Sequence, residues 1–89
     1  MALDPPSMRA PVSVVLITRN AGALLHASLD SARFADEVVV VDSGSGDDTV
    51  QIAVSFGARV IDQPWLGFGP QKQFAVERAS HNWVLCLDA

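Results

Sequence analysis

The sequence contains a single cysteine, Cys86, so it cannot form an internal disulfide framework. Cys86 lies inside an apolar run, and we expect it to be a small buried core residue and not a nucleophile. Basic residues are also scarce, because 6 Lys and Arg stand against 10 Asp and Glu, which gives a net charge of −4. A nucleic-acid-binding domain normally shows a basic stripe, so the composition argues against a nucleic-acid partner.

The chain also has no long hydrophobic segment. No stretch approaches the roughly 18 consecutive apolar residues of a membrane-spanning helix. The first residues, MALDPPSMRAP, lack the apolar core of a secretory signal and contain Asp4 and three prolines. We therefore expect a cytoplasmic protein, which can still associate with the surface of the inner membrane through parts that this sequence does not contain.

Hydrophobic residues are plentiful, at 49% of 89 residues before glycine is counted. With glycine the apolar fraction exceeds the roughly 45–50% of an average domain. Such an excess is typical of a sheet that is buried on both faces. The length allows one small domain at most.

Short β-branched runs alternate with stretches in which apolar residues recur at helical spacing. Residues 1–11 are rich in proline and are expected to form a flexible N-terminal tail. The predicted strands are residues 12–18, 37–41 with Asp42 at the end, 58–61, and 83–88. The predicted helices run from Asn20 to near Phe34, from about Asp48 to Phe56, and from the turn that contains Pro70 to about Ser80.

Five residues are expected to mark the ends of these helices. Asn20 is a suitable N-cap for the first helix, and Ser45 and Asp47 are candidate caps for the second. Gly57 suits the left-handed position that ends a helix, and Pro70 suits the first turn of the third helix.

Strands that alternate with helices through short connections indicate βαβ units, with a parallel sheet and right-handed crossovers. We therefore expect an α/β fold in which a Rossmann-like, mostly parallel sheet is flanked by helices. Ligands of such sheets bind outside the carboxyl ends of the strands. Polar residues follow all four predicted strands: Thr18-Arg19-Asn20, Asp42-Ser43-Gly44-Ser45, Asp62-Gln63 and Asp88. The sequence therefore predicts a binding cleft along this edge.

Asp42 and Asp88 carry the main chemical signal at the predicted edge. A carboxylate at a strand end can accept a hydrogen bond from a base, bridge ribose hydroxyls or help to hold a divalent metal. Taken singly, each acid is better explained as a loop cap or the start of a turn. Together, with Arg19 and Lys72 as partners for phosphate, they favour a nucleotide site.

Two aromatic residues, Trp65 and Phe68, lie in the loop before the third predicted helix. They could stack on a base or a sugar, but aromatic residues in such loops more often cover the edge of the sheet. The sequence leaves both interpretations open.

Four segments in order, VSVVLITRN, ADEVVVVDSGSGDDT, QPWLGFGPQKQFAVERA and NWVLCLDA, resemble the N-terminal half of a family 2 glycosyltransferase with the GT-A fold. The resemblance is closest to the bacterial branch that builds lipopolysaccharide core sugars, and it covers nearly all of residues 12–89. In that family LDA is followed by another acid, which completes a D-x-D motif. Residues 12–89 are thus expected to be the nucleotide-sugar-binding half of a GT-A domain, truncated at that motif.

The resemblance implies roles for residues at the ends of the first two strands. Thr18 and Asn20, with Arg19 beside them, are implied to line the nucleotide pocket. Asp42 is implied to hold the base or ribose of the donor. Ser43 stands where many relatives have a second acid, a departure that weakens the case for a uracil contact and for a UDP donor.

The resemblance also assigns the two remaining site residues. Lys72 falls where the family usually has an arginine near the donor phosphates. Asp88 is implied to contact the ribose and to lie near a metal ion, as the first acid of D-x-D. A Mg²⁺ or Mn²⁺ cofactor would offset charge on the departing nucleoside diphosphate.

The implied reaction is inverting transfer of one sugar from a nucleotide-sugar donor to a hydroxyl of a lipid-linked or glycan acceptor, in lipopolysaccharide or other cell-envelope glycan synthesis. The family's catalytic base lies in its second half. No catalytic residue is therefore expected within these 89 residues, and we expect no sugar transfer by this chain alone.

Two other classes of protein stay open at this point. A nucleotidyltransferase shares a doubly wound core and a metal at a strand end, but TRNAGALLH is a poor version of the glycine-rich, basic loop it needs. A receiver-type signalling module needs an acidic pair after its first strand, where this chain has Thr18-Arg19-Asn20.

Overall fold

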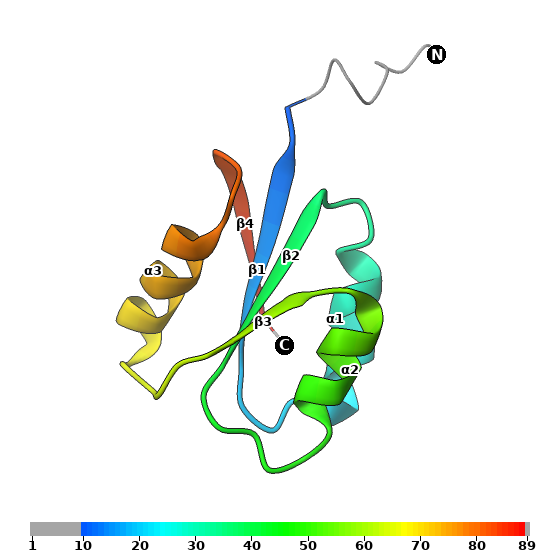
Figure 1. The fold of residues 1–89 in the computed structure, drawn as a ribbon, viewed down its shortest axis with the longest axis vertical. Coiled ribbons are helices and arrows are strands. Elements are labelled where there is room, and N and C mark those ends of the chain that lie inside the picture. Colours follow the sequence, from blue (N-terminus) through cyan, green and yellow to red (C-terminus); the bar gives the residue numbers. More distant parts are fainter. Residues whose placement is uncertain (1–9, 89) are drawn as a thin grey trace.

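The structure is a computed structural model that describes residues 10–88, so most of the predicted tail lies outside the described residues. A four-stranded parallel sheet has the order β3-β2-β1-β4. Helices α1 and α2 lie on one face of the sheet and α3 lies on the other (Figure 1). The elements are β1 (Val12–Thr18), α1 (Gly22–Ser31), β2 (Glu37–Asp42), α2 (Thr49–Phe56), β3 (Arg59–Asp62), α3 (Phe68–Arg78) and β4 (Trp83–Asp88). The predicted α/β architecture is confirmed.

The two central strands are buried on both faces, as their continuous apolar runs predict. Successive side chains of a strand point to opposite faces. Val14 and Leu16 of β1 pack with α1 and α2, whereas Val15 packs toward Ala75 of α3. Full burial of each such side chain contributes about 1.5–3 kcal/mol, so two thin apolar layers hold the helices to the sheet.

The expectation that Cys86 is buried is wrong, because the thiol is exposed. Within the described residues β4 pairs only with β1, so it forms an edge of the sheet. Its side chains Trp83 and Leu85 are also exposed, at 65% and 44%. The apolar sequence of residues 83–88 correctly predicts a strand, but it does not show whether that strand is central or lies at the edge of the sheet.

The prediction of Asn20 as the N-cap of α1 is also wrong. Asn20 has a positive φ of 52°, and its Oδ1 accepts a hydrogen bond from Gly46 N–H at 2.7 Å. The helix begins two residues later, at Gly22. The Asn20 side chain is used to join two loops, so it cannot cap the helix.

The first amides of α1 are capped from the neighbouring loop instead. Ala21 N–H donates to Thr49 Oγ1 at 2.9 Å, and Gly22 N–H donates to Asp47 Oδ2 at 3.1 Å. Asp47 also accepts from Thr49 N–H at 3.0 Å, but the N-cap position of α2 is Asp48, so the prediction of Asp47 as the cap of α2 is wrong by one residue. A Cβ at Gly22 would lie against the Asp48 carboxylate, which would have to move aside.

The remaining helix-end predictions are mixed. Gly57 ends α2 with a φ of 99°, and Pro70 lies in the first turn of α3; both are confirmed. Ser45 is not a helix cap, because its hydroxyl donates to Asp42 and accepts from Asn20 N–H. The loop after β2 is therefore held by a hydrogen bond to Asp42, the last residue of that strand.

Candidate functional site

The register of the sheet brings the polar strand ends to one edge. Thr18 pairs with Asp42, and Asp42 pairs in turn with Asp62. On the other side of β1, Ile17 pairs with Asp88. The predicted alignment of the carboxyl ends is therefore confirmed by the backbone register.

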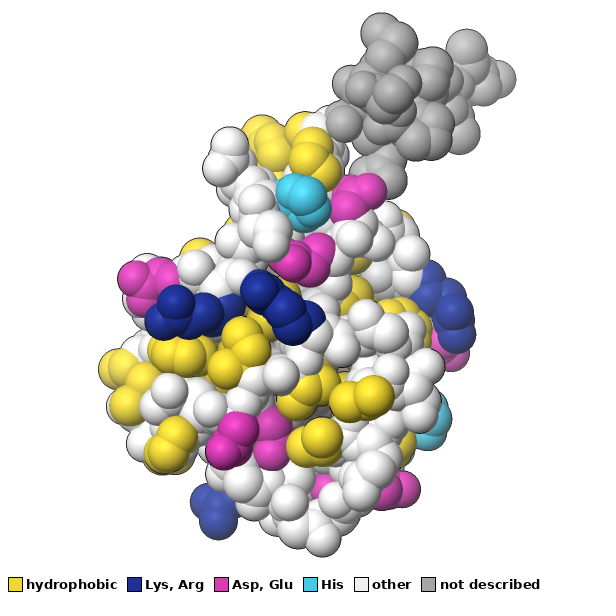
Figure 2. All heavy atoms as spheres, viewed as in Figure 1, with side chains coloured by type: hydrophobic (Ala, Val, Ile, Leu, Met, Phe, Trp, Pro, Cys, Tyr) yellow, Lys and Arg dark blue, Asp and Glu magenta, His cyan; other side chains and the backbone are white. Residues whose placement is uncertain are grey.

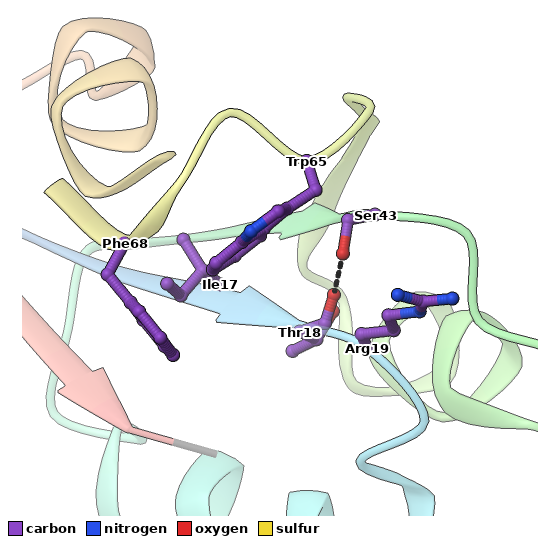
Figure 3. A pocket seen from close by; sticks show the side chains of 6 residues that line it. All are labelled: Ile17, Thr18, Arg19, Ser43, Trp65 and Phe68. Carbon is purple, nitrogen blue, oxygen red and sulfur yellow. Dashed lines mark hydrogen bonds between the residues drawn. The ribbon is translucent and has the colours of Figure 1, made fainter. Parts of the chain in front are cut away.

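A pocket of about 320 Å³ opens at this edge. It is lined by Ile17, Thr18, Arg19, Ser43, Trp65 and Phe68. Figure 3 shows Trp65 and Phe68 reaching from one side over the end of β1, while Arg19 extends from the other side, away from the two rings. The volume lies at the lower end of the range that small-molecule sites occupy.

The aromatic wall consists of Trp65, in the loop after β3, and Phe68, the first residue of α3. Their ring centroids are 4.9 Å apart with planes at 88°, an edge-to-face contact. Trp65 is 46% exposed and Phe68 is 75% exposed. Figure 2 shows hydrophobic side chains gathered at the lower left, where α3 begins. The rings thus present apolar surface to the pocket and do not fill the core.

Thr18 and Ser43 form the opposite, polar part of the pocket. Ser43 N–H donates to the Thr18 carbonyl at 3.0 Å, and the Ser43 hydroxyl reaches the same oxygen at 3.3 Å (Figure 3). These bonds continue the β1–β2 ladder one residue beyond the strands. Ser43 is therefore held against Thr18 where both residues line the pocket.

Asp42 lies beneath this edge, with only 3% of its surface exposed. Its Oδ1 accepts from the hydroxyls of Thr18 at 2.8 Å and Ser45 at 2.5 Å. Its Oδ2 accepts from the N–H groups of Gly44 at 3.1 Å and Ser45 at 2.9 Å. A carboxylate has about four acceptor positions, so the protein itself uses all of them.

The electrostatic state of Asp42 follows from this environment. Burial raises the pKa of the carboxyl, but the hydrogen bonds from Ser45, Thr18 and Gly44 together outweigh burial and lower the pKa below its usual value. Asp42 is thus charged, and the hydrogen bonds that it accepts hold the 43–45 loop in place.

Asn20 connects the loop after β1 to the same segment. Its N–H donates to the Ser45 hydroxyl at 2.8 Å, and its side chain accepts from Gly46 N–H at 2.7 Å. Asn20 does not line the pocket. Its position supports the loops that do.

The other two charged residues predicted for the site lie on α3 and at the end of β4. Lys72 is an exposed residue of α3 and is not among the residues that line the pocket. Asp88 is placed by its backbone, as the last residue of β4 beside Ile17. The structure therefore brings Thr18, Arg19 and Ser43 together in one pocket, with Asp42 and Asn20 behind it.

Gln71 is the site residue that sequence reasoning missed. It is fully buried, and its amide bonds the loop that carries Trp65. The available signal was its spacing of four from Ala75, which places both on the inner face of α3. A glutamine on that face is unusual, because buried amides require partners.

Among the side chains that the structure describes, no group of three or more His, Cys, Asp or Glu could hold a metal ion. The described residues by themselves thus do not complete a metal site. Within residues 10–88, no helix is long and apolar enough to cross a membrane.

The chain belongs to glycosyl transferase family 2, whose family model matches residues 13–89. An uncharacterised glycosyltransferase of Rickettsia felis is 46% identical over 79 residues, which cover 88% of this chain and 28% of that protein. The lipopolysaccharide core biosynthesis glycosyltransferase LpsC of Rhizobium meliloti is 36% identical over 86 residues, which cover 91% of this chain and 32% of that protein. The resemblance stated from the sequence is confirmed.

Solved structures agree with this assignment. Glucosyl-3-phosphoglycerate synthase of Mycobacterium tuberculosis, in complex with Mn²⁺, UDP and glucosyl-3-phosphoglycerate, matches with a TM-score of 0.75 and 32% identity, over 89% of this chain and 33% of that one. The same enzyme has been crystallised with Mg²⁺ and UDP. The present chain thus spans about a third of the length of the relatives it matches. The comparisons do not favour a nucleotidyltransferase or a receiver module.

Proposed function

We propose that the protein transfers a sugar from a nucleotide-sugar donor to an acceptor hydroxyl, and that residues 12–89 supply the donor-binding half of the catalytic domain. The observation that carries the proposal is the pocket formed by Thr18, Arg19 and Ser43 with the aromatic pair, at the carboxyl edge of a family 2 sheet. Its polar and apolar walls suit a ligand that has both an aromatic base and charged phosphates.

Different residues around the pocket are proposed to bind different parts of the nucleotide-sugar donor. Trp65 and Phe68 offer an apolar wall to the base or sugar, and the Ser43 hydroxyl oxygen offers a hydrogen-bond acceptor to ribose or base, while Thr18 forms part of the pocket wall. Arg19 and Lys72 supply positive charge for the diphosphate. Asn20 and Asp42 hold the 43–45 loop in place. Asp42 can contact the nucleotide sugar directly only if a hydroxyl or N–H group of that ligand replaces one of the four hydrogen bonds that Asp42 accepts from the protein.

The cofactor proposal is Mg²⁺ or Mn²⁺, supported by the mycobacterial neighbours that contain these ions with UDP. Asp88, at the end of β4, is the proposed protein ligand. The donor diphosphate is proposed to supply further oxygen ligands to the ion. The ion's chemistry is to offset negative charge on the leaving diphosphate.

The proposed stereochemical course is inversion at the sugar carbon, with a catalytic base that lies outside these 89 residues. The proposed acceptor is a lipid-linked or glycan hydroxyl of the cell envelope, supported by the similarity to LpsC. A lipid-linked acceptor would bring the protein to the cytoplasmic surface of the inner membrane.

The direct test is a transfer assay with the full-length protein. Radiolabelled UDP-, GDP-, CMP- and dTDP-sugars are incubated with Mn²⁺ and an envelope glycan fraction, and labelled product is separated from donor. We expect one donor to give labelled glycan, and NMR of the new linkage to show inverted anomeric configuration. Absence of transfer from every donor, with a folded protein, would count against the proposal, and retained configuration would overturn the inverting course.

A further inference from the structure

We propose that Gln71 is a positioning residue for the donor site, which holds Trp65 in place as one wall of the pocket. The identity of the ligand in this proposal rests on the proposed function. The link between Gln71 and Trp65 rests on the geometry of the loop alone.

Gln71 is 0% exposed, although it carries an amide that needs partners. Its Nε2 donates to the Gln63 carbonyl at 3.2 Å, and its Oε1 accepts from Leu66 N–H at 3.0 Å. These two partners lie on either side of Pro64 and Trp65. One buried side chain therefore bridges the loop across the residue that faces the pocket.

The loop itself has little regular structure to hold it. Residues 63–67 belong to no helix or strand, and Gly67 has a φ of 103°. Its start is tied to β2, because Gln63 N–H donates to the Asp42 carbonyl at 2.9 Å. Its end joins α3, because Gln71 N–H donates to the Gly67 carbonyl at 2.8 Å. Between these two ties, the Gln71 amide fixes the backbone on both sides of Trp65.

The consequence concerns a side chain that is half in solvent. Trp65 is 46% exposed, so core packing alone does not fix it, and its ring is set against Phe68 at 4.9 Å. If the Trp65 ring is already ordered before the ligand arrives, a flat ligand binds it without the entropic cost of ordering that side chain. Loss of an aromatic stacking partner weakens binding of a base by about tenfold or more.

The positional part is tested by tryptophan fluorescence without any ligand. The chain has 2 Trp residues, and Trp83 begins β4 at the far, amino end of the sheet. In the full-length protein any further tryptophans are replaced together with Trp83→Phe, so that Trp65 is the reporter. Gln71→Met keeps the length of the side chain and removes both hydrogen bonds. Gln73→Met is the matched control, because Gln73 is an exposed residue of the same helix.

We expect Gln71→Met to lower the fluorescence anisotropy of Trp65 and to raise its quenching by acrylamide, while Gln73→Met changes neither. Gln71→Leu also removes both hydrogen bonds with a shorter apolar side chain and should give a change in the same direction. Circular dichroism establishes that each variant is folded, and if Gln71→Met does not fold, the Leu variant decides. Unchanged anisotropy and quenching in the folded Gln71 variants would overturn the proposal.

The functional part is tested by a double-mutant cycle with UDP and Mn²⁺ as the calorimetric probe. If Gln71 acts through Trp65, then Gln71→Met and Trp65→Leu each weaken UDP binding by about tenfold, and the double variant binds no more weakly than Trp65→Leu alone. A full further loss from Gln71→Met in the Trp65→Leu background would show that Gln71 acts by another route. Failure of the unaltered protein to bind UDP would count against a UDP site, while the fluorescence comparison still decides the link between Gln71 and Trp65.

Discussion

Thr18 Oγ1 donates a hydrogen bond to Asp42 Oδ1 at 2.8 Å, between the last residues of β1 and β2. The two residues are partners in the parallel register and are only 5% and 3% exposed. Since Ser45 and Gly44 occupy the remaining acceptor positions of Asp42, this carboxylate organises the loop at the pocket. We expect its effect on donor binding to pass largely through that loop.

The first prediction concerns Asp42→Asn. The amide cannot accept four hydrogen bonds, so part-buried donors of the 43–45 loop lose their partner. We expect the free energy of unfolding to fall by about 1–3 kcal/mol and nucleotide-sugar affinity to fall with it. Urea unfolding and calorimetry measure the two effects. Asp62→Asn is the control, because Asp62 is the exposed register partner of Asp42 on β3. Equal stability and affinity in the two variants would contradict this role.

The second prediction is the pH dependence of stability. Burial raises the pKa of Asp42, but hydrogen bonds from Ser45, Thr18 and Gly44 outweigh burial and lower the pKa below its usual value. The pKa of Glu37 is lowered in the same way, because hydrogen bonds from Ser80 and Ser13 and the positive charge of Arg59 outweigh the effect of burial. A lowered pKa means that the stabilisation is fully present above the unfolded pKa of about 4 and is lost as pH falls through the folded value.

We therefore expect the free energy of unfolding to decline as pH falls below about 4.5, and to decline less steeply in Asp42→Asn. Urea titrations at a series of pH values measure the slope. A slope in Asp42→Asn equal to that of the unaltered protein would show that Asp42 does not carry the effect.

The third prediction concerns Arg19→Gln. Arg19 lines the pocket and is exposed, so its charge can reach a donor diphosphate. We expect UDP affinity to fall by about tenfold at low salt and by less at high salt, where screening weakens the charge. Arg33→Gln is the control, because Arg33 pairs with Asp30 at the far end of α1, at 2.8 Å. Equal losses in the two variants would mean that Arg19 contributes only through net charge.

The fourth prediction concerns the β4 edge. Trp83 and Leu85 are exposed on a strand that, among the described residues, has a neighbour on one side only. Unpaired apolar edges promote association, so we expect the isolated 89-residue chain to form oligomers. Leu85→Lys should shift it toward monomer in analytical ultracentrifugation. Leu24→Lys, on the exposed side of α1 at 66%, should not. A monodisperse monomer of the unaltered chain would contradict the prediction.

The sequence predicts the sheet well, because β-branched runs such as residues 37–41 have few alternatives to a buried strand. It also predicts the edge at which Thr18, Arg19 and Ser43 meet, because parallel strands align their carboxyl ends. It does not predict the caps of α1, since the partners of Ala21 and Gly22 lie 28 and 25 residues away. A local sequence pattern identifies only nearby capping residues, whereas these amides bond Thr49 and Asp47 at the start of α2.

The roles of Trp65 and Gln71 escape sequence reasoning for a related reason. An aromatic residue in a loop looks the same in the sequence whether it lines a pocket or covers the sheet. Only its position in the folded structure distinguishes the two roles. For Cys86, the apolar neighbours indicate a strand correctly, yet burial depends on what packs against β4. The exposure of the thiol follows from the edge position of that strand.

The central claim is that the pocket at the carboxyl edge binds a nucleotide-sugar donor. Calorimetric titration of the full-length protein with UDP-, GDP-, CMP- and dTDP-sugars, with and without Mn²⁺, tests it most directly. Three variants accompany the unaltered protein. Ser43→Phe fills the pocket, Ser55→Phe places the same ring on the exposed side of α2 as a control, and Asp88→Asn removes the negative charge of the proposed metal ligand.

We expect one nucleotide sugar to bind with a single site per chain. Ser43→Phe should abolish measurable binding, Ser55→Phe should leave it unchanged, and Asp88→Asn should reduce the gain in affinity from Mn²⁺. If no nucleotide sugar binds the folded protein, or if binding survives unchanged in Ser43→Phe, the donor site does not lie at this edge of the sheet.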